Sequence, residues 1–460
     1  MKKANCLSPD AAQRNPRIAT PDSVACAIAS ELCAAHVVLS DNESFQTLNG
    51  LWKGKKSPLT RAIVVRNTNF TNEGILDLRD VAELDVETKQ LASRTLQRGD
   101  IIIERSGGGP KQAVGRVCYF DATGELPYSF SNFTSVIRVL DPACLLPRYV
   151  HYRLLHLYKD GYTEGLQHAT TGIRNLDFSS YLKADIPVLP MPEQQKIAAI
   201  LWKLQRAIAT QDRLLKATRD LKQSAMQRLF THGLRGEALK DTEIGALPES
   251  WNVRSLGEFG RIGNGSTPKK TRPEYWRDGT TPWLTSAKVH EGIIREADQY
   301  VSQVAVKECH LPIVPTGSLL VAITGQGKTL GNAALVEFDT TISQHLAYVR
   351  FDRDDVHPAY VYQFMRSRYK ELQSIGRAGG STKAALTCAF LRDYRVPCPP
   401  IDEQRDIATA LATLDRKLAH HQRKRAALND LFQSTLHQLM TAQIRVADLD
   451  IDIDISDVVQ

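Results

Sequence analysis

Apolar residues recur at alternating steps of four and three along two stretches of the chain, one starting near residue 190 and the other near residue 400. This spacing keeps one helix face apolar and is typical of a heptad seam. It predicts two helices of about 40 residues, on the order of 60 Å long at 1.5 Å per residue. The residues expected to pack along the seams are Ile197, Leu201, Leu204, Ile208 and Leu215 in the first stretch and Ile407, Leu411, Leu414, Leu418 and Leu428 in the second.

The two stretches are copies of each other, offset by 210 residues. Each opens with Pro-x-x-Glu-Gln, at residues 190–194 and 400–404, where proline ends the preceding strand and the helix dipole favours a carboxylate in the first turn. Gln211 and His421 occupy the same seam position in the two copies. We interpret them as a polar layer that sets the register of helix pairing.

A weaker repeat continues outside the helices, because Gly99, Gly107 and Gly109 match Gly317, Gly325 and Gly327 at an offset of 218. Apolar runs at residues 100–104 and 318–323, bounded by glycine, predict strands in both globular parts. The fold class predicted is therefore α+β, with two tandem mixed domains. The expected segments are residues 1–44, unassigned and without a counterpart in the second half; a domain at 45–187; a helix at 188–236; a domain at 237–396; a helix at 397–445; and an acidic tail at 446–460.

Composition and charge narrow the class of protein. The chain has 460 residues, of which 42% are hydrophobic and 24% charged, which excludes collagen-like, wholly disordered and multi-spanning membrane proteins. The tail holds five aspartates and no lysine or arginine, so without it the formal charge rises from +7 to +12. A basic body favours a polyanionic partner, most often nucleic acid.

The cysteines and the N-terminal segment indicate a compartment. Eight cysteines are scattered without a Cys-x-x-Cys pair, and the mildly apolar stretch at residues 23–39 is interrupted by charge, so we expect neither a disulfide framework nor a signal peptide. This predicts a reduced, cytoplasmic protein without a membrane anchor. His420 and His421 could suggest a metal pair, but adjacent helical residues point in different directions, and no metal site is expected.

One catalytic pattern needs weighing. Residues 322–329 read Ala-Ile-Thr-Gly-Gln-Gly-Lys-Thr, a relaxed phosphate-loop pattern ending at Lys328 and Thr329. A phosphate loop requires a helix directly after it, and Leu-Gly-Asn at 330–332 argues against one. A nucleotide-dependent enzyme built around Lys328 stays open as an alternative. Since no other catalytic motif is present, the chain is interpreted as a binding protein with no catalytic residues of its own.

Flexible polar loops carry the candidate contacts to DNA. Gly-Asn-Gly-Ser-Thr-Pro-Lys-Lys at 263–270 and the lysine-rich run at 52–56 combine phosphate-neutralising charge with polar side chains able to read bases. Trp276 and Trp283, which follow the first of these loops, are expected in the core. The candidate DNA-binding residues are Lys53, Lys55, Lys56, Arg66, Asn67, Lys111 and Arg174 in the first half and Asn264, Ser266, Thr267, Lys269, Lys270, Lys288, Lys328 and Lys383 in the second.

Together these features resemble the specificity subunit of a type I restriction–modification enzyme. The resemblance rests on the duplicated Pro-x-x-Glu-Gln helix starts, the Gly-Asp-Ile-Ile strand at residue 99 and the Gly-x-Ser-Thr-Pro, Tyr-Trp and Pro-Trp run at 263–283, and it covers about residues 45–445. It implies two target recognition domains separated by two long helices that pack as an antiparallel coiled coil.

The resemblance also implies partners. They would be double-stranded DNA read as two half-sites, methyltransferase subunits docked on the helices, and restriction subunits that translocate and cleave. S-adenosylmethionine, ATP and Mg²⁺ would belong to those partner subunits, and this chain would hold no cofactor or metal. A coiled-coil scaffold without a DNA target is the remaining alternative.

Overall fold

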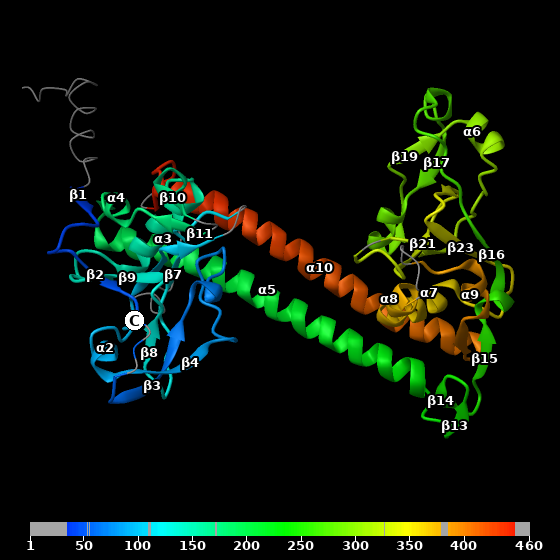
Figure 1. Ribbon diagram of the computed structural model, residues 1–460, viewed down its shortest axis with the longest axis horizontal. Coiled ribbons are helices and arrows are strands. Elements are labelled where there is room, and N and C mark those ends of the chain that lie inside the picture. The colour runs from blue at the N-terminus through cyan, green and yellow to red at the C-terminus, as the bar shows by residue number, and fades with distance from the viewer. Residues whose placement is uncertain are drawn as a thin grey trace, which may run out of the picture. The chain divides into compact units, whose positions relative to one another are not determined.

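The computed structural model describes residues 35–52, 54, 56–108, 112–170, 173–325, 327–378 and 385–446. These residues fall into two compact units, and many of their elements are labelled in Figure 1. Unit 1 combines the chain up to Ala209 with the chain from Ala426, and unit 2 runs from Thr210 to Arg425. The long helices α5 (Met191–His232) and α10 (Ile401–Met440) each contribute one part to either unit. No helix in the described part of the chain is long and apolar enough to cross a membrane.

Unit 1 contains a four-stranded sheet, two three-stranded sheets and a strand pair. Its strands are β1 (Ala35–Val38), β2 (Phe45–Asn49), β3 (Leu59–Val65), β4 (Ala82–Glu87), β5 (Ile101–Glu104), β6 (Ser106–Gly107), β7 (Val117–Tyr119), β8 (Tyr128–Phe130), β9 (Thr134–Val139), β10 (Gln167–Thr170), β11 (Ile173–Leu176) and β12 (Asp185–Val188). Its shorter helices are η1 (Asn67–Asn69), α2 (Thr88–Ala92), α3 (Pro147–Lys159), η2 (Glu164–Leu166) and α4 (Phe178–Tyr181).

Unit 2 contains a five-stranded sheet, a three-stranded sheet and two strand pairs. Its strands are β13 (Leu239–Thr242), β14 (Gly245–Pro248), β15 (Asn252–Ser255), β16 (Gly260–Asn264), β17 (Thr281–Leu284), β18 (Ile293–Ile294), β19 (Gln299–Val301), β20 (Leu319–Ala322), β21 (Ala333–Val336), β22 (Thr341–Ile342), β23 (Leu346–Phe351) and β24 (Arg395–Cys398). Its shorter helices are η3 (Leu256–Phe259), η4 (Pro273–Tyr275), η5 (Ser286–Glu291), α6 (Gln303–Glu308), α7 (Pro358–Ser367), α8 (Tyr369–Ala378) and α9 (Cys388–Asp393).

The two units share one sheet topology. The main sheet runs β2-β9-β5-β7 in unit 1 and β16-β23-β20-β21 in unit 2, where β18 is added at the edge. The register agrees as well, since Ile101 lies opposite Ile137 as Leu319 lies opposite Val349. In the second sheet, β3 and β17 each have one antiparallel and one parallel neighbour. The weak sequence repeat therefore marks a duplication of the fold, and the predicted α+β class with tandem mixed domains is confirmed.

The central strands are apolar throughout because both of their faces are covered. All residues of β5 and of β20 are buried. Successive side chains of a strand point to opposite faces. Accordingly, Ile101 and Ile103 join the core that includes α3, while Ile102 joins the core beneath the second sheet. The expectation of strands in these two apolar runs is correct.

The N-terminal boundary differs from the expectation. β1 pairs antiparallel with β12, from Ala35 opposite Val188 to Val38 opposite Asp185. In unit 2, β15 pairs with β24 in the same manner. The expectation that residues 1–44 lack a counterpart in the second half is therefore wrong for residues 35–38. Four residues that pair with a strand about 150 positions away leave too short a local pattern to be recognised.

The structure explains the glutamine of each Pro-x-x-Glu-Gln motif. Gln194 is buried, accepts a hydrogen bond from the backbone N–H of Leu146 (2.8 Å) and donates to the carbonyls of Cys144 (2.9 Å) and Leu189 (2.8 Å). In unit 2, Gln404 repeats this pattern with the N–H of His357 and the carbonyls of Asp355 and Pro399, at 2.8, 3.0 and 2.9 Å. Each glutamine thus satisfies the free N–H before α3 or α7 and fastens that helix to the start of a long helix.

The long helices pair antiparallel within each unit. In unit 2, Gln211 hydrogen-bonds His421 (2.9 Å) and Lys222 pairs with Asp415 (2.5 Å), so residue numbers rise on one helix as they fall on the other. The helices are shorter at both ends than the predicted 188–236 and 397–445, and they start later because extended strand continues to Val188 and Cys398. Of the predicted seam, Ile197, Leu201, Ile208, Leu215, Ile407 and Leu411 are buried, and Leu204, Leu414, Leu418 and Leu428 are partly buried.

Candidate nucleic-acid interface

In each unit the loops that follow several strands meet at one edge of the sheets. In unit 2, β16, β17 and β20 end there and β23 begins, with Asn264 opposite Ala347 and Ala322 opposite Leu346. We call the described residues of 264–267, 285–292, 323–332 and 343–345 the unit 2 loop edge, and those of 49–52, 66–72, 105–116 and 131–133 the unit 1 loop edge. Because the topologies match, the two loop edges occupy the same place in their units.

The glycine-containing loop of unit 2 is held from one side by α8. Gln373 and Arg377 donate to the carbonyl of Gly327 at 2.7 and 3.1 Å, and the hydroxyl of Tyr369 donates to the carbonyl of Lys328 at 2.8 Å. The Lys328 side chain is exposed. The backbone of this loop is therefore anchored while its cation remains available.

The same loop does not have the structure of a phosphate loop. After Lys328 the chain turns and enters the strand β21 at Ala333, whereas a phosphate loop leads into a helix whose N-terminal N–H groups surround the anion. The anchored carbonyls of Gly327 and Lys328 face protein donors. The alternative of a nucleotide-dependent enzyme built around Lys328 is not supported.

Polar side chains that are distant in sequence converge around this loop. His290 hydrogen-bonds Thr329 (3.3 Å) and Asn332 (3.1 Å) through its two ring nitrogens, and His345 hydrogen-bonds Thr324 (2.5 Å). His290 and His345 are exposed. Sequence reasoning missed these histidines and Asn332, because each is isolated in the sequence and only the strand order brings them together.

The loop around Gly107 in unit 1 is held by a buried ion pair between Arg116 and Glu104. Arg116 makes two hydrogen bonds to Glu104, both at 2.8 Å, and Glu104 is completely buried. Asn67 donates to Glu104 (3.1 Å) and to the carbonyl of Ser106 (3.2 Å). A Cβ at Gly107 would lie 2.3 Å from the Asn67 amide, and the φ of Gly107 is +127°, so this position requires glycine.

The predicted contacts of unit 1 do not all lie at its loop edge. Arg66 and Asn67 do, and Arg174 on β11 lies opposite Gly107. Asn67 is occupied in holding the loop. Lys56 lies three residues before β3 and four residues after Trp52; it is exposed, and its N–H donates to Glu87 (2.9 Å). Its contact with DNA stays a prediction. Lys53, Lys55, Lys111 and Lys383 lie outside the described residues.

In unit 2, most of the predicted contacts do lie together. Asn264, Lys269 and Lys270 are exposed, and Ser266 and Thr267 are partly buried beside them. The Nε1 of Trp283 donates to the carbonyl of Ser266 (3.1 Å), and the Nε1 of Trp276 donates to that of Lys269 (3.2 Å). The expectation that these tryptophans belong to the core is correct for Trp283, which is 2% exposed, and Trp276 packs edge-on against it.

Lys288 differs from the other lysines of unit 2. Its side chain is 12% exposed and its ammonium pairs with Glu291 at 2.6 Å. The hydrogen bond to Glu291 raises the pKa of Lys288. The charge of Lys288 is therefore partly neutralised within the protein, and its contact with DNA stays a prediction. The sequence pattern considered only the place of Lys288 after a strand, and did not indicate that its ammonium pairs with Glu291, one helical turn further along.

Two tandem mixed sheet domains, each with a polar loop edge and each followed by a helix of about 40 residues, define a class of duplicated recognition proteins. The chain matches the family model "Type I restriction modification DNA specificity domain" over residues 49–217 and 248–430, and it belongs to this family. Two relatives show the extent of similarity. A candidate type I restriction enzyme MjaX specificity subunit of Methanocaldococcus jannaschii is 22% identical over 365 residues, 79% of this chain and 82% of that protein. The EcoR124I/EcoR124II specificity subunit of Escherichia coli is 24% identical over 288 residues, 62% of this chain and 67% of that protein.

Solved structures show the same fold. The S subunit of a type I restriction–modification system from M. genitalium matches with a TM-score of 0.56 at 16% identity, over 88% of this chain and 95% of that chain. A chain from a study of assembly and conformational transition of the type I system matches with a TM-score of 0.51 at 19% identity, over 88% and 97%. The protein is therefore a non-catalytic DNA specificity subunit, a type of subunit that assembles with DNA and with other subunits of its system.

Proposed function

We propose that each unit reads one half of a bipartite double-stranded DNA target through its loop edge. The observation that carries this proposal is the repetition of one polar, glycine-containing loop edge at the same place in two units of the same topology. One chain then holds two separate reading surfaces, as a split target requires.

The chemistry of the unit 2 loop edge suits this task. Lys328 of this loop edge, and Lys269 and Lys270 just after its residues 264–267, are exposed and can neutralise phosphates, which provides affinity but no sequence preference. Asn264 and Asn332 carry amides of the kind that pair with adenine in the major groove. Hydrogen bonds that hold the loop backbone reduce the entropy lost when such side chains are ordered on DNA.

The finer assignment of partners follows the resemblance to specificity subunits. The long helices bind methyltransferase subunits, and restriction subunits that translocate and cleave DNA join that complex. S-adenosylmethionine, ATP and Mg²⁺ are bound by those subunits, and this chain holds none of them. The assembly works in the cytoplasm.

Salt dependence of binding tests the phosphate contacts. In the complex with its methyltransferase subunits, Lys269→Gln, Lys270→Gln and Lys328→Gln each weaken binding to matched and unmatched DNA alike. Each lowers the slope of log K against log salt concentration by up to about 0.9. Lys240→Gln is the control, because Lys240 lies on β13, outside the residues of the unit 2 loop edge, and its ammonium donates to the carbonyl of Glu249. An unchanged slope in all three variants contradicts the proposed interface.

Replacement of one domain tests whether each unit reads one half of the DNA target. Residues 45–187 are exchanged for the matching segment of another such subunit, and the methylated sequence is determined by methylome sequencing. We expect one half of the target to change and the other half to stay. A change in both halves contradicts the assignment of one half-site to each unit.

A further inference from the structure

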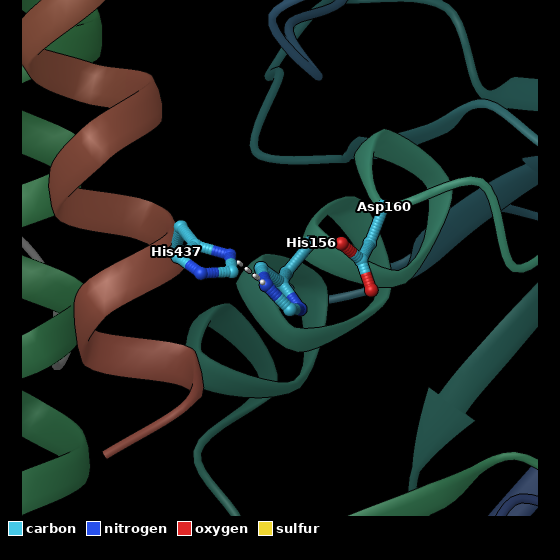
Figure 2. A group of neighbouring side chains, drawn as sticks. All are labelled: His156, Asp160 and His437. Atoms are coloured by element: carbon cyan, nitrogen blue, oxygen red, sulfur yellow. Dashed lines mark hydrogen bonds between the residues drawn. The ribbon is translucent and has the colours of Figure 1, made fainter. Parts of the chain in front are cut away.

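Three side chains of the types that bind transition metals meet in unit 1, outside the residues of its loop edge. His156 and Asp160 stand one turn apart at the C-terminal end of α3, and His437 faces them from the last turn of α10 (Figure 2). One potential ligand atom from each residue lies within 4.8 Å of the others. Among the described residues this is the one group of three or more such side chains that is close enough to hold a metal ion.

The spacing of the two imidazoles matches that of two metal ligands. The Nε2 of His156 lies 3.3 Å from the Nδ1 of His437, at the length of a long hydrogen bond. Zinc binds histidine nitrogen at 2.0–2.1 Å in a tetrahedron, which separates two nitrogen ligands by about 3.3 Å. The two nitrogens therefore already stand at the separation of two zinc ligands.

One residue of this group is buried and two are exposed. His156 is 5% exposed, whereas Asp160 and His437 lie at the surface, where an ion can reach them. Asp160 makes no ion pair with any residue that the structure describes, so its carboxylate is free to neutralise part of a cation's charge.

We propose that His156, Asp160 and His437 form a site for a divalent transition metal, most suitably Zn²⁺, that joins the end of α10 to α3. Two imidazoles and one carboxylate supply three of four tetrahedral positions, and water completes the set. The metal binds only where both helices are in place, so it stabilises this part of unit 1. Unit 2 has no such site, because the equivalent positions hold Ser367, Glu371 and Gln227.

Titration of the full chain with metal tests the site. The protein, produced without a histidine tag and treated with a chelator, is titrated with ZnCl₂ and, for spectroscopy, with CoCl₂. We expect one strongly bound ion per chain and the visible absorption of tetrahedral Co²⁺. Hydrogen exchange should slow in α3 and in residues 426–440 when Zn²⁺ is added, and stay unchanged in α7 and residues 401–425.

Matched variants locate the ion. His437→Gln introduces the residue that unit 2 has at this position, and since His437 is exposed the protein should still fold. It should reduce Zn²⁺ affinity by more than the roughly 10- to 100-fold typical for loss of an outer-shell partner. His420→Gln, on the exposed face of α10, is the control and should bind as the parent does. A parent chain that binds no Zn²⁺, or a His437→Gln variant that binds it equally well, overturns the proposal.

Discussion

Units 1 and 2 build the junction between the long helices and a domain helix from different side chains. In unit 1, the hydroxyl of Tyr152 donates to Gln205 (2.6 Å), and Phe432 of α10 packs edge-on against the Tyr152 ring. The equivalent positions in unit 2 are Gln363, Asp415 and Lys222. There Asp415 accepts from Lys222 (2.5 Å) and from Gln363 (2.8 Å). An aromatic, neutral contact in one unit thus corresponds to a partly buried ion pair in the other.

Other parts of the junction are identical. The glutamine of each Pro-x-x-Glu-Gln motif makes the same three hydrogen bonds in both units, and a tyrosine hydroxyl donates to a proline carbonyl in both, Tyr149 to Pro187 and Tyr360 to Pro397. Side chains that satisfy backbone groups cannot be exchanged for other types, because the backbone presents the same donors and acceptors each time. Side chains that satisfy only each other can change together.

The largest effect is expected at the two motif glutamines. Gln194→Met and Gln404→Met each remove three hydrogen bonds and leave a buried N–H without its acceptor. At about 1–3 kcal/mol per unsatisfied group, we expect each unit to lose about 3–5 kcal/mol of stability. Hydrogen exchange of α3 and α7 reports the two units separately. Losses that differ by several kcal/mol would show that the two anchors are not equivalent.

The second-largest loss of stability is expected at the ion pair between Lys222 and Asp415 in unit 2. Lys222→Met removes the nearer of the two cations of Asp415. Breaking a fully buried pair costs about 3–5 kcal/mol, and we expect about 2 kcal/mol here, because Asp415 is 31% exposed and keeps Arg366 at 3.6 Å. Lys222→Met with Asp415→Gln removes both charges and should recover to within about 1 kcal/mol of the parent. Denaturant unfolding followed by exchange in α7 measures both variants. If the double variant were as unstable as Lys222→Met alone, the idea that the two charges compensate each other would be wrong.

The stability of unit 1 should depend more on acid than that of unit 2, because the two units also differ at a buried position of α3 and α7. His151 of α3 is 1% exposed where unit 2 has Tyr362. Burial, with the charge of Arg148, lowers the pKa of His151 from 6.5 to about 3. The unfolded chain therefore binds a proton that the folded unit does not, and unit 1 loses stability as the pH falls below 6.5. The loss at pH 5 is about 2 kcal/mol at 1.36 kcal/mol per unit.

Exchange in α3 and α7 at pH 7 and pH 5 measures this acid sensitivity. We expect His151→Phe to reduce the pH dependence of unit 1, leaving a smaller part from His156, whose pKa burial also lowers. Equal acid sensitivity of α3 and α7 in the parent would contradict the assignment to His151.

The smallest effect concerns the tyrosine hydroxyls shared by both units. Tyr149→Phe and Tyr360→Phe each delete one hydrogen bond to a proline carbonyl, of 3.0 and 2.9 Å. Each should cost about 1 kcal/mol. Thermal unfolding monitored per unit checks this value. A negligible cost at both positions would mean that water replaces the hydroxyl.

The sequence by itself determined the long helices, their seams and the central strands. Positions such as Leu201 and Leu411 are spaced by the helical period in both copies, and the continuous apolar runs at Ile101 and Leu319 are what a strand covered on both faces requires. The duplication was also visible, since the two copies share residues at a constant offset. Such features depend on neighbours a few positions apart, and local periodicity records them.

Only the tertiary structure decided which distant residues meet. His290, Thr324 and His345 converge because three strands end at one edge, and His156 meets His437 across 281 positions. Long-range contacts depend on topology and on compensation between partners, as between Lys222 and Asp415. Neither leaves a periodic trace in the sequence.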